Sequence, residues 1–169
     1  MPVGRRGCSA TSATKPAASK PTATSGGSAD LAASNFGGGL NGAGVGVAVV
    51  DTGVQAHPDL QRPAGEPQVV EVEVVGHEPG LADYYGHGTH VAGIISGNGA
   101  ASSDSLSFRT FRGLAPAAQI ISIRALAADG TGYTSDIITA IVWAIRNRET
   151  YNIRVLNLSL GHPIFESYK

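Results

Sequence analysis

The stretch GVGVAVVDTG, residues 44–53, decides the fold class of this chain. Its apolar part, residues 45–50, is short and is preceded by glycines, a pattern that predicts a buried β-strand. Asp51 is the first charged residue after this run, so we expect it at the carboxyl end of the strand. Functional residues of parallel α/β sheets lie at the carboxyl ends of strands. Asp51 is therefore a candidate functional residue.

Outside this stretch, apolar patterns predict strands and helices in alternation. Residues 68–75, QVVEVEVV, alternate valine with glutamate, as expected for a strand with one wet face. Residues 119–126, QIISIRAL, and residues 154–161, RVLNLSLG, predict two further strands. The apolar spacing of residues 87–96 and 134–147 predicts two helices. This alternation indicates an α/β fold in which helices cover a mostly parallel sheet.

The helix predicted over residues 134–147 has recognisable end signals. Thr134 or Ser135 is expected to cap its amino terminus, and Asp136 complements the helix dipole. Three apolar side chains share one face of this helix: Ile137, Ile141 and Ala144. We expect that face to pack on the sheet.

Composition limits the functions that the chain can have. Its 169 residues, 42% hydrophobic content and net charge of -1 are typical of one globular domain and argue against a general nucleic-acid binder. Cys8 is the only cysteine, which excludes a disulfide within the chain and a cysteine-based metal site. No apolar run approaches the roughly 18 residues that a membrane span needs.

Residues 1–28 form a segment of distinct composition. Fourteen of them are Ala, Ser or Thr, four are Lys or Arg, and none is acidic. Such a segment buries too little apolar surface to offset its ordering entropy, so we expect a disordered tail followed by one folded unit over residues 29–169. Arg5 and Arg6 are not followed by the apolar stretch of a signal peptide.

The stretch YYGHGTHVAG, residues 84–93, places two histidines and three glycines at the start of a predicted helix. His87 and His90 have a spacing that is also found in zinc sites, but no third ligand of similar quality is evident. A catalytic role explains more, because the flanking glycines let a substrate chain approach His87. We expect His87 to be a general base and His90 to be structural.

Asp51 is open to other interpretations. An aspartate in an Asp-x-Gly sequence is commonly a turn residue that binds nearby amides. The sequence VVDTG, residues 49–53, also resembles the aspartic-protease signature, although that all-β fold offers no place for the two helices. The glycines of residues 42–46 precede the strand, whereas a dinucleotide-binding loop follows one.

Four motifs in order carry a resemblance to a known family. They are VAVVDTGVQAHPDL (residues 47–60), GHGTHVAGIISGNG (86–99), RGLAPAAQIISIRAL (112–126) and LNLSLG (156–161). In this order they resemble the first half of the catalytic domain of subtilisin-like serine proteases, also called subtilases or peptidase family S8. The resemblance implies a three-layer α/β/α fold with a mostly parallel sheet, incomplete at its carboxyl end. Residues 29–169 would then be the amino-terminal portion of such a peptidase domain.

The resemblance also implies site residues. Asp51 matches the triad carboxylate and His87 the general base of an Asp-His-Ser triad. Peptide or protein substrates of the family lie as an extended strand between two enzyme segments, which this chain matches with six residues: Gly130, Thr131, Gly132, Ser159, Leu160 and Gly161. No cofactor is required. Asp59 matches a position that often binds calcium in the family, and carboxylate oxygen suits that cation.

The family nucleophile is a serine in a Gly-Thr-Ser motif, at a helix start well beyond the position matched by Gly161. The printed chain ends at Lys169 before such a motif. We therefore expect an inactive fragment of a serine-type endopeptidase, with a non-catalytic peptide-binding module as the alternative. An extracellular location agrees with the family, while oligomeric state and substrate preference stay open.

Overall fold

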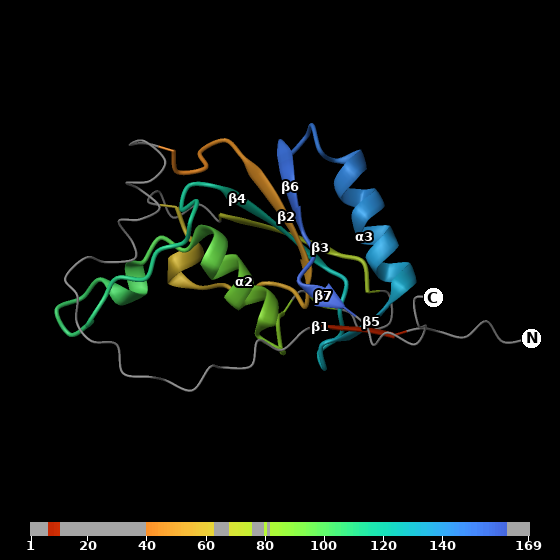
Figure 1. Cartoon of the computed structure of the whole chain (residues 1–169), viewed down its shortest axis with the longest axis horizontal. Helices are drawn as coiled ribbons and strands as arrows, with labels where there is room; N and C mark the ends of the chain where they lie inside the picture. Colours follow the sequence, from red (N-terminus) through yellow and green to blue (C-terminus); the bar gives the residue numbers. More distant parts are fainter. Residues whose placement is uncertain (1–6, 11–39, 63–67, 76–79, 81, 162–169) are drawn as a thin grey trace, which may run out of the picture.

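The computed structural model of the chain describes residues 7–10, 40–62, 68–75, 80 and 82–161 (Figure 1). Its elements follow in the order β1 (Gly7–Ala10), β2 (Gly46–Asp51), the 3-10 helix η1 (Pro58–Leu60), β3 (Val69–Glu73), α2 (His87–Ser96), the 3-10 helix η2 (Ala100–Ser102), β4 (Gln119–Arg124), β5 (Thr131–Tyr133), α3 (Thr134–Arg146), β6 (Ile153–Asn157) and β7 (Leu160–Gly161).

The central sheet has four strands in the order β3-β4-β2-β6. All three neighbouring pairs are parallel, which confirms the predicted α/β fold with a mostly parallel sheet. In the register of the β2–β4 pair, Asp51 at the end of β2 lies beside Arg124 at the end of β4. The carboxyl ends of these strands therefore meet at one edge of the sheet, the edge at which sites of such folds form.

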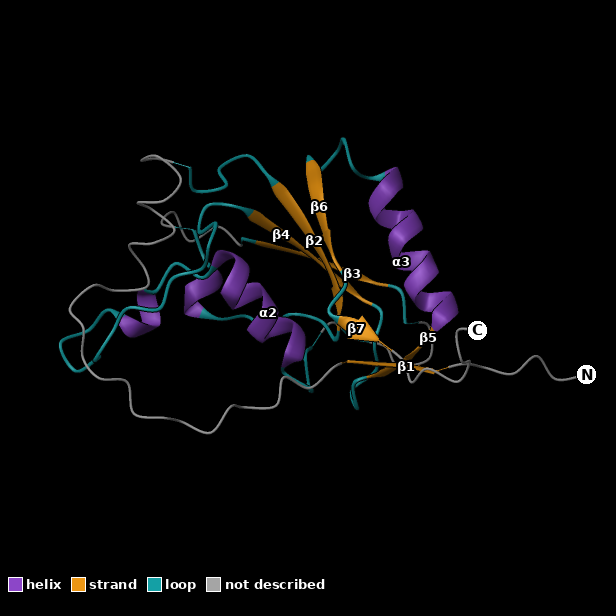
Figure 2. Cartoon of the chain, viewed as in Figure 1, coloured by secondary structure: helices purple, strands orange, loops and turns teal. Residues whose placement is uncertain are grey.

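The two long helices cover opposite faces of this sheet (Figure 2). On the α2 side, Val47 and Val49 of β2 belong to a buried cluster that includes Ala92 of α2. On the α3 side, Ala48 and Val50 belong to a second cluster with α3 residues. Successive side chains of a strand point to opposite faces, so one apolar strand supplies both cores. This arrangement fixes β2, and the residue at its end, between two packed layers.

Helix α3 begins where β5 ends, and this contradicts one expectation. Thr134 or Ser135 was expected to cap the helix, but both already lie within it, and the N-cap residue is Tyr133, which makes no side-chain cap bond. The prediction was wrong because the strand continues into the helix without a turn residue between them. Asp136 does lie in the first turn and Arg146 in the last, where their charges favour the helix dipole.

The carboxyl-terminal apolar stretch forms two strands instead of the single predicted one. Strand β6 ends at Asn157, and the short strand β7 begins at Leu160. Strand β7 leaves the parallel sheet and joins a second sheet of three strands, in the order β5-β1-β7.

The middle strand of that second sheet comes from the segment that we expected to be disordered. Strand β1, Gly7–Ala10, pairs antiparallel with β5 on one side and with β7 on the other. Ser9 has register partners on both sides, Thr131 and Gly161, whereas Gly7 and Cys8 pair with β5 alone and Ala10 with β7 alone. The remaining residues of 1–28 lie outside the described residues, and the boundary at residue 29 stays a prediction. Within the described part of the chain, no helix is long and apolar enough to cross a membrane.

Candidate active site

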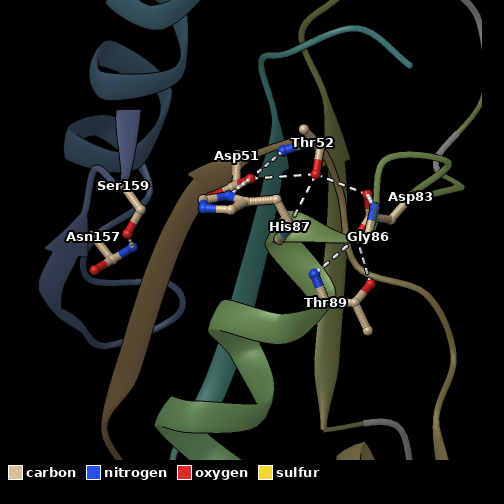
Figure 3. Close-up of polar contacts among 9 residues, drawn as sticks. Asp51, Thr52, Asp83, Gly86, His87, Thr89, Asn157 and Ser159 are labelled. Atoms are coloured by element: carbon tan, nitrogen blue, oxygen red, sulfur yellow. Dashed lines mark hydrogen bonds and ion pairs between the residues drawn. The ribbon is translucent and has the colours of Figure 1, made fainter. Parts of the chain in front are cut away.

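Asp51 and His87 face each other at the carboxyl edge of the sheet (Figure 3). Asp51 is the last residue of β2, and His87 is the first residue of α2. The Nδ1 atom of His87 lies 2.8 Å from Oδ1 and 2.9 Å from Oδ2 of Asp51. Because an ionised carboxylate only accepts hydrogen bonds, the tautomer that fits this geometry keeps its proton on Nδ1 and donates a hydrogen bond to Asp51. The other ring nitrogen, Nε2, is then free to accept a proton.

Burial differs between these two side chains in a way that suits their positions. Asp51 is 1% exposed, whereas the side chain of His87 is 12% exposed. The carboxylate also accepts a hydrogen bond of 2.8 Å from the backbone N–H of Thr52. The carboxylate is thus held by neighbouring donors in the interior, while the imidazole is reachable from solvent.

A close approach between α2 and the end of β2 brings the pair together. Gly88, the second residue of α2, is buried against the chain that follows Asp51. A Cβ at this position would overlap the carbonyl oxygen of Gly53 and would lie 3.2 Å from the Cβ of Asp51. Only glycine therefore allows the first turn of the helix to start so near the strand end.

Asp83 is a site residue that sequence reasoning missed. Its carboxylate is buried, with 9% of the residue exposed, and lies between the amino end of α2 and the segment after β2. Burial raises the pKa of Asp83, but hydrogen bonds from Thr89, Thr52 and Gly86 together lower that pKa below its ordinary value. One signal could have identified it. An acidic residue stands four positions before His87, ahead of a helix whose N-cap, Gly86, has no side chain to bond the first turn.

His90 does not join the catalytic pair. Its side chain is exposed, and its backbone N–H bonds the carbonyl of Gly86 at 3.2 Å, as an ordinary first-turn residue does. Within the described residues, no group of three or more His, Cys, Asp or Glu side chains could hold a metal ion. The zinc alternative gains no support from this arrangement.

The six residues predicted to bind substrate lie on two segments that a third strand joins. Thr131 and Gly132 belong to β5, and Leu160 and Gly161 belong to β7. Both strands pair with β1: Thr131 and Gly161 face the same β1 residue, Ser9, from opposite sides. The two segments therefore flank one extended chain, although their role in substrate binding stays a prediction.

The remaining two of the six predicted residues lie at the ends of these strands. Gly130 precedes β5 with a φ of 79°, and Ser159 precedes β7 and accepts a 2.8 Å hydrogen bond from the side chain of Asn157 (Figure 3). A Cβ at Gly130 would lie 2.8 Å from the ring of Tyr85, and a Cβ at Gly132 would lie 2.6 Å from Leu126. The aromatic contact brings the loop before His87 against the turn before β5, which the sequence alone did not indicate.

Asp59, the calcium candidate, already has protein partners. Its Oδ1 accepts a hydrogen bond of 2.7 Å from the N–H of Ala101, and its carbonyl accepts one of 2.8 Å from the N–H of Asn98. These bonds attach the η2 region to η1. Calcium binding by Asp59 stays a prediction.

The fold and the site define an α/β protein with an aspartate-histidine pair at the carboxyl edge of a parallel sheet. The family model described as the Subtilase family matches residues 42–169, and the chain belongs to this family. Subtilisin BL and Subtilisin Savinase, both from Lederbergia lenta, are each 42% identical to this chain over 125 residues, covering 74% of it and 40% of their own length.

A solved structure gives the same result for the fold. The crystal structure of a cold adapted subtilisin-like serine proteinase matches with a TM-score of 0.51 and 31% identity, over 67% of this chain and 36% of that one. The described fold is therefore subtilisin-like. The chain spans about 40% of the length of the two subtilisins.

Proposed function

We propose that the protein is a serine-type endopeptidase in which Asp51 orients His87 and His87 acts as the general base. The observation that carries this proposal is the placement of His87 Nδ1 between the two carboxylate oxygens of buried Asp51, at 2.8 and 2.9 Å. Membership of the subtilase family supports serine-type endopeptidase activity in general.

The chemistry of the pair follows from its hydrogen bonding. A serine hydroxyl becomes a good nucleophile when Nε2 of a neutral histidine removes its proton as the hydroxyl attacks a peptide carbonyl. Asp51 holds the required tautomer and stabilises the imidazolium that forms. His87 then gives the proton to the leaving amine. The nucleophile that we propose is a serine in a Gly-Thr-Ser motif at a helix start, as the family resemblance implies.

The substrate that we propose is an extended segment of a peptide or protein, bound between β5 and β7. Support comes from β1, which already lies there as the middle strand of an antiparallel sheet. Main-chain pairing on both sides of a strand recognises any extended peptide, and side-chain pockets add selectivity. We further propose that the protein acts outside the cell, as expected for its family.

The test compares the 169-residue chain with a longer product that continues to a Gly-Thr-Ser motif at a helix start. Each is incubated with a fluorophosphonate probe and a peptide substrate. We expect no turnover and no labelling of the 169-residue chain. The longer product should be labelled at its motif serine, and His87→Ala should lower hydrolysis by about 10⁶-fold by removing the base. Stoichiometric labelling of a serine within residues 1–169 would contradict the proposal.

A second candidate, a non-catalytic peptide-binding module, is favoured by one observation. Both strands that flank the extended segment lie within the described residues. Peptide binding by the longer product without hydrolysis would favour it. The aspartic-protease alternative needs two carboxylates that share a proton, whereas the partner of the Asp51 carboxylate is His87.

A further inference from the structure

We propose that Asp83 is a positioning residue for the Asp51–His87 pair. Its carboxylate joins the first turn of α2, which carries His87, to the segment that follows Asp51. The inference rests on the proposed function for its catalytic meaning. How Asp83 holds the side chains of Asp51 and His87 can be measured without peptide hydrolysis.

Each oxygen of the Asp83 carboxylate receives two hydrogen bonds. Oδ1 accepts from the hydroxyl of Thr52 at 2.7 Å and from the N–H of Gly86 at 2.8 Å. Oδ2 accepts from the N–H and the hydroxyl of Thr89 at 2.8 and 2.6 Å. Gly86 precedes His87 in the sequence and Thr89 follows it. The three bonds from these two residues therefore fix the helical turn from which the imidazole extends.

The fourth bond reaches Thr52, the residue that directly follows Asp51 at the end of β2. The Thr52 hydroxyl, which donates to Asp83, accepts a hydrogen bond of 3.0 Å from the N–H of Gly88. The backbone N–H of the same threonine donates to Asp51 Oδ1 at 2.8 Å. Thr52 therefore touches the Asp83 carboxylate, the helix start and the Asp51 carboxylate at once.

A second path connects the same elements. The Thr89 hydroxyl donates to Asp83 and accepts a hydrogen bond of 2.8 Å from the N–H of Gln55. Gln55 lies four residues after Asp51. Asp83 thus acts on both sides of the pair through two threonine hydroxyls, which exceeds what a simple cap of the helix terminus would require.

The arrangement requires a carboxylate and not its amide. The N–H of Gly86 lies on Oδ1 and the N–H of Thr89 on Oδ2, and each can only donate. In Asp83→Asn, the amide nitrogen faces one of these donors whichever way the side chain turns. A buried N–H donor is then left without an acceptor. We expect the first turn of α2 to shift so that this donor finds another partner.

The experiment is NMR of the isotopically labelled longer product, observing the His87 Nδ1–H proton that bonds Asp51. We expect a low-field resonance in the wild-type chain and its loss in Asp83→Asn. The matched control is Ala92→Gly, which weakens the same helix at a buried residue without touching Asp83. This control should keep the resonance.

Thr52→Val is the second variant and decides the result if Asp83→Asn does not fold. It keeps the shape of the side chain and the backbone N–H bond to Asp51, and it removes the hydroxyl that lies 2.7 Å from Asp83 Oδ1, 3.0 Å from the Gly88 nitrogen and 3.3 Å from Asp51 Oδ1. Because the single hydroxyl hydrogen serves the shorter contact, with Asp83, the main loss is the link between Asp83 and the helix start, and the resonance should weaken or disappear. A folded Asp83→Asn chain that keeps the wild-type resonance would overturn the proposal. An unchanged resonance in Thr52→Val, or an equal loss in Ala92→Gly, would also overturn it.

A kinetic measurement separates this inference from the proposed function. In the longer product, Asp83→Asn should lower kcat by about 10²-fold, because displacement of a catalytic group by about 1 Å has this effect, and should leave KM nearly unchanged. An equal change in KM would instead indicate a structural role. If the longer product has no peptidase activity but the NMR results hold, the proposed function fails and the positioning role stands.

Discussion

The Asp51 carboxylate bonds the imidazole of His87 and the backbone N–H of Thr52, and the hydroxyl of Thr52 lies 3.3 Å from its Oδ1. From this arrangement we expect the charge of Asp51 to be more important than its shape. An amide of the same size can donate to Nδ1 of His87, and the proton would then move to Nε2, the atom that must accept one from serine.

We therefore expect Asp51→Asn to lower kcat of the longer product by about 10⁴-fold, as the wrong histidine tautomer does in such triads. Folding should be retained, because the substitution preserves volume. The measurement is steady-state peptide hydrolysis together with circular dichroism. A decrease in kcat of less than about tenfold would indicate that Asp51 is a turn residue, which is the other interpretation of its sequence.

Asp83 gives a pH dependence of stability whose sign is fixed by its pKa. Burial opposes ionisation, yet bonds from Thr89, Thr52 and Gly86 lower the folded-state pKa below the ordinary value of 3.8. A lowered folded-state pKa contributes stability above the unfolded-state value, and this contribution is lost as pH falls through the folded-state pKa.

The free energy of unfolding of wild type minus that of Asp83→Asn should accordingly be constant at neutral pH and should shrink below about pH 3.8. Urea titrations at several pH values measure this difference. A difference that grows as pH falls would show that the folded-state pKa of Asp83 is raised.

At the scale of elements, β1 occupies the place between β5 and β7 that we propose for peptides. The segment and an added peptide need the same backbone donors and acceptors, so they compete. The pairing is specific in register, since Cys8 lies beside Gly132 and Ala10 beside Leu160.

Removal of residues 1–28 should therefore increase the affinity of the chain for an extended peptide by at least about tenfold, because the internal competitor is absent. Fluorescence polarisation of a labelled peptide measures this change. The control is a chain in which residues 1–6 alone are removed, which leaves β1 and should bind as the full chain does. Equal affinity of all three chains would exclude competition by β1.

The sequence predicted those elements whose signals are local. Asp51 and His87 stand at the ends of strongly patterned segments, and the order of the motifs was sufficient to select them. The cap of α3 was misassigned because β5, a short strand with few apolar residues, was not recognised before it. The role of Asp83 depends on contact with Thr52, 31 positions away in sequence, and the position of β1 depends on pairing with residues more than 100 positions away. The acidic residue four positions before His87 marks Asp83 as a partner of the helix start, but no local pattern indicates its bond to Thr52 or the place of β1.

At the scale of the whole molecule, apolar side chains on α3 and on β6 are among the exposed ones of the described residues. On α3, Ile138 and Ile145 are 56% and 58% exposed, and on β6, Val155 is 50% exposed. Strand β6 is also an edge of the described sheet. Exposed apolar faces and open strand edges favour association with another chain.

The 169-residue chain should therefore self-associate at micromolar concentration, which sedimentation velocity measures. Replacing Ile138 and Ile145 by glutamine should shift the distribution toward monomer without loss of α3, since both side chains are outside the core. The same replacement at Ile94, an exposed residue of α2 on the other face, is the control and should have little effect. A monomer at all concentrations would contradict this expectation.

The close approach of Gly88 to Gly53 also has a genetic consequence. Any side chain at position 88 would place a Cβ on the carbonyl oxygen of Gly53, which is backbone and cannot rotate away. Every single-base change in a glycine codon that replaces the residue by another introduces a Cβ. Every missense mutation that is one base away from this codon should therefore disturb the geometry of the Asp51–His87 pair. Natural alleles of the gene should vary at exposed positions such as Tyr84 more often than at Gly88.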